Sequence, residues 1–343
     1  MEFFDPDSVG IANGNYFGLP VTPDEASLIF LPVPWDATVS YGKGTADGPE
    51  AMLEASLQID LFDERIPRAW EMSAAALPCD AALRKDGEQA RKAAEKVIGE
   101  LAAGVPQDRL EALAAKVNEA SERMNSHVYG TSSEYLSRGK TVAVIGGDHS
   151  VPLGLFRAEA EAFGGFGILH IDAHADLRKA YEGFRYSHAS IMYNALEGIP
   201  EVSRIVQVGI RDYCRSEHEL AVSSDRVGMF SDRAIKEAMF DGRTWRKICG
   251  QIIESLPENV HISFDIDGLS PEYCPSTGTP VPGGLSFSQA DYLLFLLAVS
   301  GKRIIGFDLC EVAPSGRDEW DANVGARMLF KLALYTLFSG KRL

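Results

Sequence analysis

The chain has 343 residues, 45% of them hydrophobic and 24% charged, and its formal net charge at pH 7 is −16. This acidic balance argues against nucleic acid and anionic membranes as partners, because both require a basic surface. The apolar stretches are too short to span a bilayer, the N-terminus lacks the features of a signal peptide, and the five cysteines form no CxxC pair. We therefore expect a cytoplasmic protein with free thiols.

Apolar, strand-like runs alternate along the chain with helical patterns, which is typical of βαβ units and a parallel sheet. No repeat, low-complexity tract or flexible linker interrupts the sequence. The length allows one large α/β domain or two smaller ones, and we expect a single compact domain over residues 1–343. The expected strands are residues 27–33, 141–145, 166–171, 204–210, 260–264 and 303–309.

Two helical regions stand out between and after these strands. In the stretch from about 83 to 137, Leu113, Val117 and Met124 recur at helical spacing, and residues 104–106 (Gly-Val-Pro) separate two expected helices. Residues 286–289 (Ser-Phe-Ser-Gln) form a capping-box pattern, which predicts the start of another helix.

Three of the expected strands are followed by segments rich in aspartate and histidine: GGDHS at 146–150, DAHAD at 172–176 and DIDG at 265–268. In a parallel sheet the carboxyl ends of the strands share one edge, so these segments are expected to converge. So much negative charge at short range is unfavourable without a cation. The sequence therefore predicts a polynuclear metal site. Its candidate ligands are His149, Asp172, His174, Asp176, Asp265 and Asp267.

The spacing within these motifs supports metal binding. Asp172, His174 and Asp176 are each two residues apart, so they point to the same side of an extended segment. Mixed carboxylate and imidazole ligands suit manganese, iron, nickel, cobalt or zinc better than calcium or magnesium. One carboxylate that can bridge in each acidic motif suggests two metals about 3.5–4 Å apart. The alternative for any single motif is that its aspartate and histidine only cap a helix.

At these residues the chain resembles the ureohydrolases, the family of arginase, agmatinase and formiminoglutamase. Residues 34–38 (PWDAT) and 44–49 (GTADGP) are similar to the first conserved loop of that family, 275–285 to its TGTP–GGL loop, and 311–314 (EVAP) to its late glutamate motif. The resemblance runs from about residue 31 to the C-terminus and is interrupted at about 83–137, which predicts a family-variable helical insertion. It implies a three-layer α/β/α fold with a mostly parallel sheet of about eight strands, and a homo-oligomer, either a trimer or a hexamer.

The resemblance also implies a division of the ligands between two metals, usually manganese in this family, with nickel as the alternative. Asp172 and Asp265 would bridge the two ions, which would activate a shared water for attack on a guanidinium carbon and release urea and an amine. His149, Asp172, Asp176 and Asp265 would hold the first metal, and His174, Asp172, Asp265 and Asp267 the second.

The remaining expected site residues come from the same resemblance. His188 would shuttle protons, with Asp176 in the catalytic set as well as among the ligands, although the usual His-Gly-x-Pro is Ser187-His188-Ala189-Ser190 here. A helix-start histidine bonded to the backbone is the alternative for His188. Glu311 would pair with the substrate guanidinium, in a motif that reads Glu-Val-Ala-Pro where the family has Glu-Val-Asn-Pro. Thr279 would lie near the reacting nitrogens.

The substrate is less defined. Residues 176–180 (DLRKA) replace the Asp-Ile-Asn-Thr loop by which arginases hold the amino-acid end of arginine. Arg178 could attract a substrate carboxylate, or it could be an ordinary ion-paired arginine. Tyr181, Phe184, Tyr186 and Tyr193 could narrow the pocket, or they could pack in the core. We expect an agmatine-like or smaller guanidine as substrate, with arginine, guanidinobutyrate, free guanidine and alkylated guanidines left open.

Two other function classes remain as alternatives. A single-zinc deacetylase of the same fold needs fewer acidic ligands, so Asp176, Asp267 and His149 argue against it. A catalytically silent partner subunit would be expected to lack a ligand, and none is missing. Among the other histidines, we expect His170 to be buried and hydrogen-bonded and His261 to be structural.

Overall fold

The computed structural model describes residues 4–316 and 318–342, and its centre is an eight-stranded sheet in which every adjacent pair of strands is parallel. The strand order is β2-β1-β3-β8-β7-β4-β5-β6. Within the described part of the chain, no helix is long and apolar enough to cross a membrane. The strands are β1 (Leu28–Val33), β2 (Ala74–Ala76), β3 (Thr141–Gly146), β4 (Phe166–Ile171), β5 (Val202–Val208), β6 (Val227–Phe230), β7 (Asn259–Asp265) and β8 (Arg303–Cys310).

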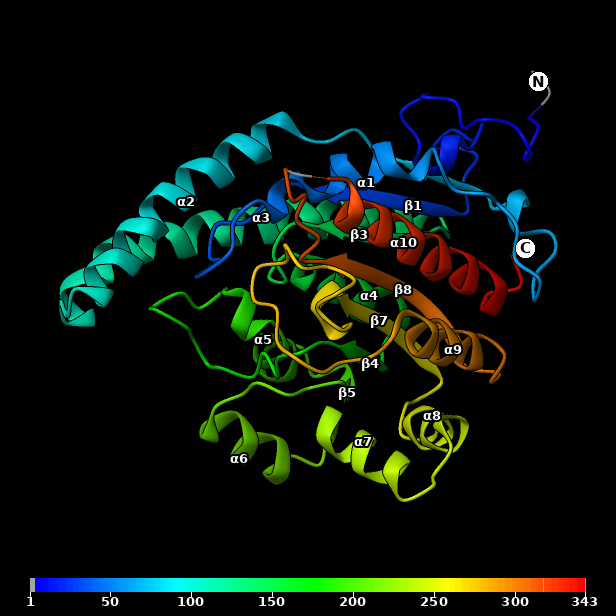
Figure 1. Ribbon diagram of the computed structural model, residues 1–343. Helices are drawn as coiled ribbons and strands as arrows, with labels where there is room; N and C mark the ends of the chain where they lie inside the picture. Colours follow the sequence, from blue (N-terminus) through cyan, green and yellow to red (C-terminus); the bar gives the residue numbers. More distant parts are fainter. Residues whose placement is uncertain (1–3, 317, 343) are drawn as a thin grey trace.

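Helices cover both faces of the sheet, which gives the three-layer α/β/α arrangement seen in Figure 1. The central strands are almost entirely buried, because side chains on both of their faces pack against helices. One face carries α1 (Gly48–Ser56), α7 (Asp232–Phe240), α8 (Trp245–Glu254), α9 (Phe287–Ala298) and α10 (Trp320–Ser339). The other face carries α2 (Ala81–Ala102), α3 (Glu111–Ser137), α4 (Leu153–Phe163), α5 (Ile191–Gly198) and α6 (Arg215–Ser223).

The expected sheet is confirmed, with differences at its edges. The short edge strands β2 and β6 were not among the expected strands, and the run expected at 204–210 forms a strand at Val202–Val208. The capping box is confirmed, because the Ser286 hydroxyl accepts the N–H of Gln289 and the Gln289 side chain accepts the N–H of Ser286.

The helical stretch expected at 83–137 forms a hairpin of α2 and α3. The two helices meet at a connection that contains a 3-10 turn at Gln107–Leu110, and they run side by side and project from the rest of the molecule (Figure 1). We call this pair the α2–α3 hairpin. Its status as a family-variable insertion stays a prediction.

Candidate metal centre and substrate pocket

The candidate site lies at the carboxyl ends of four neighbouring strands, β3, β8, β7 and β4, which occupy the centre of the sheet. Because all four run in the same direction, the segments that follow them meet at one edge. His149 follows β3, Asp172 follows β4, Asp265 ends β7 and Glu311 follows β8. The sheet order thus explains why residues far apart in the sequence share one site.

A first group of candidate ligands surrounds the imidazole of His149. Its Nδ1 atom lies 3.0 Å from Asp172 Oδ2, 3.4 Å from Asp176 Oδ2 and 3.3 Å from Asp265 Oδ2. All four side chains are buried. One imidazole nitrogen facing three carboxylates is a donor set that suits a divalent transition metal.

A second group surrounds His174, whose Nδ1 atom lies 3.4 Å from Asp172 Oδ1 and 3.2 Å from Asp267 Oδ2. Asp172 therefore directs one carboxylate oxygen to each group, and its expected bridging role stays a prediction. The buried Oδ2 atom of Asp267 has no hydrogen-bond partner within the described parts of the chain. Asp265 contacts the first group, and its other oxygen accepts the N–H of Asp267 at 2.8 Å. The bridging role expected for Asp265 stays a prediction.

The electrostatics of both groups favour a bound cation. Burial, together with the charges of Asp267 and Asp172, raises the pKa of Asp265 well above its usual value. Burial and Asp172 raise the pKa of Asp176 to about 6. Burial alone would lower the pKa of His174, but the carboxylates of Asp267 and Asp172 raise it to about 12. Carboxylates that resist ionising together are stabilised by divalent cations, so the residues present fit divalent metal ions.

Behind His149 lies a buried polar chain that the sequence did not suggest. His149 Nε2 lies 2.9 Å from Ser263 Oγ and 3.5 Å from Asp308 Oδ1. The other oxygen of Asp308 lies 2.9 Å from His261 Nε2, and His261 Nδ1 lies 2.8 Å from Glu159 Oε2. The expectation of a structural His261 agrees with these contacts. The one sequence feature that could have suggested a role for Asp308 is that it is the single acidic residue in the mostly apolar strand β8.

His170 is buried and hydrogen-bonded, as expected. Its Nε2 atom lies 2.8 Å from Asp172 Oδ2, and its Nδ1 atom lies 3.0 Å from Gln207 Nε2. It thereby helps to fix the carboxylate that faces both groups.

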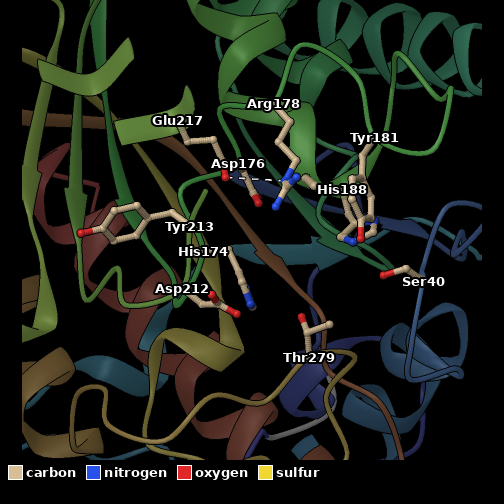
Figure 2. A pocket seen from close by; sticks show the side chains of 11 residues that line it. Ser40, His174, Asp176, Arg178, Tyr181, His188, Asp212, Tyr213, Glu217 and Thr279 are labelled. Carbon is tan, nitrogen blue, oxygen red and sulfur yellow. Dashed lines mark ion pairs between the residues drawn. The ribbon is translucent and has the colours of Figure 1, made fainter. Parts of the chain in front are cut away.

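A cavity of about 150 Å³ opens beside the candidate metal centre (Figure 2). In Figure 2, Arg178 extends towards this cavity from one side, and His174 and Thr279 lie on the other. The residues that line it are Ser40, His174, Asp176, Arg178, Tyr181, His188, Ala189, Asp212, Tyr213, Glu217 and Thr279. Asp212, Tyr213 and Glu217 follow β5 and were not foreseen, because no motif in that stretch marks them.

His188 lies in the cavity wall at the start of a 3-10 turn, His188–Ser190. Its backbone N–H donates to Thr38 Oγ1 at 3.2 Å, and its Nδ1 atom lies 3.5 Å from Ser187 Oγ. His188 thus begins a helical turn and also lines the cavity, and its expected role as proton shuttle stays a prediction. Burial, with the nearby charges of His174 and His149, lowers the pKa of His188 to about 4.

Glu311 is not among the residues that line the cavity. It is buried, its Oε1 atom accepts the N–H of His149 at 3.0 Å, and its Oε2 atom has no hydrogen-bond partner among the residues described. A Cβ atom added at Gly278 would come within 3.0 Å of that free oxygen. The expected contact between Glu311 and the substrate stays a prediction.

Arg178 is held from two sides. Its Nε atom lies 3.5 Å from Glu217 Oε2, and its guanidinium lies 4.8 Å from the centroid of the Tyr181 ring. The buried Glu217 also accepts the N–H groups of Cys214 and Leu177. Arg178 thus forms an ion pair with Glu217, as one of the two expectations held, although its guanidinium still faces the cavity.

The four aromatic residues after DAHAD have different surroundings. Tyr181 lines the cavity, whereas Tyr186 and Tyr193 line a separate groove and Phe184 is buried against the α2–α3 hairpin. Of these four, only Tyr181 is placed to narrow the cavity.

An all-parallel α/β/α fold with a buried histidine–aspartate centre at its strand ends defines the chain as a candidate metallohydrolase. The model of the arginase family matches residues 26–335, and the chain belongs to that family. It is 35% identical over 303 residues to an N(1)-aminopropylagmatine ureohydrolase of Thermus thermophilus, covering 88% of each protein. It is 31% identical to the agmatinase of Neisseria meningitidis serogroup A, covering 92% of this chain and 89% of that one. The chain is accordingly a ureohydrolase-type hydrolase of C–N bonds.

Solved structures agree on the fold. The agmatine ureohydrolase of Thermoplasma volcanium superposes with a TM-score of 0.72 at 21% identity, covering 96% of this chain and 97% of that one. The formiminoglutamase of Trypanosoma cruzi, whose structure is described with Mn²⁺, superposes with a TM-score of 0.71 at 18% identity, covering 94% and 97%.

Proposed function

We propose that the chain hydrolyses the guanidinium group of agmatine, or of agmatine extended by an aminopropyl group, to urea and an amine. The observation that carries the proposed hydrolytic chemistry is the position of Asp172, whose two oxygens face His149 and His174 separately. The choice of substrate rests on the relatives. Relatives named for these two substrates cover most of the chain. The proposed setting is a cytoplasmic homo-oligomer, a trimer or hexamer, without nucleic-acid or membrane partners.

Two divalent ions, manganese by preference and nickel as the alternative, would supply an activated water for attack on the guanidinium carbon. The proposed ligands are the six residues of the two groups. His188 is the proposed proton shuttle. Because its pKa is lowered to about 4, the ring is neutral at pH 7, and a proton that it takes up from the attacking water would be passed on readily to the leaving amine.

Two further residues would orient the guanidinium. The buried Oε2 atom of Glu311, which has no hydrogen-bond partner among the described residues, would accept a charge-assisted hydrogen bond from it. The hydroxyl of Thr279 in the cavity wall would lie near the reacting nitrogens.

The far end of the substrate would be recognised by Asp212. This exposed carboxylate lines the cavity, and it makes no hydrogen bond or ion pair within the described chain. Glu217, the other cavity acid from the same stretch, is already bound to two backbone N–H groups and Arg178. Asp212 is therefore the acid that is free to bind a distal ammonium group.

One observation favours a second candidate. The Arg178 guanidinium faces the cavity, so it could bind the carboxylate of arginine or of a guanidino acid. Its ion pair with Glu217 argues for the first candidate, because a substrate carboxylate would have to compete with a buried acid.

Urea release should be measured across agmatine, aminopropylagmatine, arginine, guanidinobutyrate and guanidine, with metal content determined on the same samples. We expect two ions per subunit and a higher kcat/KM for an amine-terminated guanidine than for arginine. Asp212→Asn should lower that kcat/KM by about tenfold and leave free guanidine unaffected, whereas the exposed Asp60→Asn control should change neither. A kcat/KM for arginine above that of every other compound, abolished by Arg178→Ala, would establish the second candidate.

A further inference from the structure

We infer that the α2–α3 hairpin is a positioning device for the two loops that form the cavity wall, and that it acts through Arg91 of α2 and Asn118 of α3. The first loop is residues 35–44, and the second is residues 178–188. This inference rests on the proposed function, since the group it positions is the ring of His188.

Asn118 holds the second loop by both ends of its amide. Its Nδ2 atom donates to Gly183 O at 3.2 Å, and its Oδ1 atom accepts the N–H of Arg185 at 2.7 Å. Between these two points the Phe184 side chain, 1% exposed, packs against both helices of the hairpin. The helical residues around the ring are Ala94 and Val97 of α2, and Ala114 and Val117 of α3. The tip of the loop is thus bound by hydrogen bonds on either side of a buried anchor.

The conformation of this tip needs such support. Tyr181 and Phe184 exchange two backbone hydrogen bonds, of 3.1 and 2.8 Å, around a tight turn. The two turn residues have left-handed backbones, with φ of 54° at Glu182 and 86° at Gly183. Only the glycine adopts this conformation without strain, so the turn at Glu182 must be stabilised by its surroundings.

The tip in turn places Tyr181 against the catalytic candidates. The Tyr181 ring packs edge-on against the His188 ring, with the two centroids 6.2 Å apart. The Arg178 guanidinium lies over the face of the same tyrosine ring. Figure 2 shows these three side chains gathered on one side of the cavity. A shift of the tip would therefore move the wall that contacts His188.

Arg91 holds the first loop. Its guanidinium donates to the carbonyl of Val39, and the carbonyl of Asp36 lies 3.5 Å away. Between them, Thr38 Oγ1 accepts the N–H of His188 at 3.2 Å, and the Thr38 hydroxyl donates to Asp148. The two loops therefore meet at Thr38 and His188, and each is held by a different helix of the same hairpin.

Helix α2 also packs directly against the start of the first loop. A Cβ atom added at Gly87 of α2 would come within 3.0 Å of the Trp35 ring at the start of the first loop. Misplacement of a reacting group by about 1 Å can lower turnover by about 10²-fold. Loosening either contact should accordingly reduce catalysis without touching the metal ligands.

Asn118→Ala and Arg91→Met test the inference. Each should lower kcat by about tenfold, leave two metal ions per subunit, and speed amide hydrogen exchange in residues 178–188 of the metal-loaded protein. The matched control is Arg123→Ala, which breaks a bidentate ion pair with Asp86, of 2.9 and 3.0 Å, between the same two helices and away from the loops. It should keep the kcat and the loop exchange of the wild type.

A double-mutant cycle separates positioning from a general loss of stability. If the hairpin acts on His188, adding Asn118→Ala to His188→Ala should cause no further loss of kcat. Wild-type kcat and loop exchange in Asn118→Ala, an equal loss in Arg123→Ala, or full additivity with His188→Ala would overturn the inference. A His188→Ala variant that alone has wild-type turnover would instead reject the proposed shuttle. If Asn118→Ala does not fold, Phe184→Leu loosens the same tip and is held to the same outcomes.

Discussion

Asp176 and Glu311 share a backbone conformation that is uncommon outside glycine, with φ of 53° and 63° respectively. Both residues follow strands whose ends form the candidate metal centre, and both carry buried carboxyl groups. Burial raises the pKa of each. The fold therefore maintains two strained backbones and two poorly solvated acids at one place, which is typical of sites organised for binding rather than for stability.

Asp176→Asn should make the metal-free protein more stable. Asparagine tolerates a positive φ, and it removes a carboxylate whose pKa is raised to about 6 and which is therefore destabilised when ionised at pH 7. We expect a gain of at most about 3 kcal/mol in the free energy of unfolding, measured by urea denaturation of chelator-treated protein, together with the loss of one metal ion on reloading. A less stable apoprotein would show that the Asp176 carboxylate supports the fold.

Substitutions of the shared and unshared carboxylates should differ in metal content. Asp172→Asn should bind neither ion tightly, because its two oxygens face both His149 and His174. Asp267→Asn should lose only the ion beside His174 and retain about one per subunit. Elemental analysis after dialysis against excess manganese distinguishes these results, and equal metal content in the two variants would contradict a bridging Asp172.

His188→Ala should keep both metals but lower turnover by about 10²-fold or more, the usual size of a general acid–base contribution. The ring lines the cavity and is not among the proposed ligands. Because its pKa is lowered to about 4, the neutral ring persists as pH falls, so the loss of kcat from protonation of His188 should have its midpoint near pH 4. Unchanged turnover would assign His188 a structural role, and loss of metal would make it a ligand.

Glu311→Gln should raise KM for a cationic guanidine and lower kcat as well, since the proposed ion pair both binds and orients the substrate. Gln keeps an oxygen to accept the N–H of His149, so the metal group should stay intact. Steady-state kinetics with agmatine, alongside metal analysis, provide the check. Wild-type kinetics would remove Glu311 from the pocket.

The pair of His261 and Glu159 should make stability depend on pH in the alkaline range. Although burial opposes it, the flanking Glu159 and Asp308 raise the pKa of His261 from 6.5 to about 9. A raised folded-state pKa gives a stabilisation that is full below pH 6.5 and disappears as the pH rises to 9, worth at most about 3 kcal/mol. Urea denaturation of the wild type should show this decline, and the double variant Glu159→Gln, His261→Asn should lack it. Parallel pH profiles in the two proteins would contradict it.

The sequence predicted the centre of the molecule better than its periphery. The three motifs follow apolar strands, and the parallel arrangement predicts that His149, Asp172 and Asp265 lie at one edge of the sheet. The strand order β3-β8-β7-β4 then brings them together. The edge strands were missed because β2 is three alanines and β6 is four residues long, so neither shows a clear period.

Contacts between side chains far apart in the sequence could not be predicted either. Glu159 lies in a helix and Asp308 in a strand, and only the packed fold reveals that His261 contacts both. The same holds for Asn118, which lies 65 residues from its partner Gly183. Arg178 could be read in two ways until Glu217, in a stretch without motifs, was placed beside it. In each case the contact depends on side-chain packing between distant segments, which local patterns do not encode.

The strand order has a consequence for the biosynthesis of the protein. β3 and β4 follow one another in the sequence, but β8 and β7 lie between them in the sheet. His149 and Asp172 are 23 residues apart in the sequence. Their side chains therefore take up their positions beside one another only when β7 and β8 have been added between β3 and β4. Closing such long loops is slow and comes late in folding. A nascent chain emerging from the ribosome would thus expose four of its six candidate ligands long before it could capture a metal, and metal uptake would await β8, the last strand to be translated.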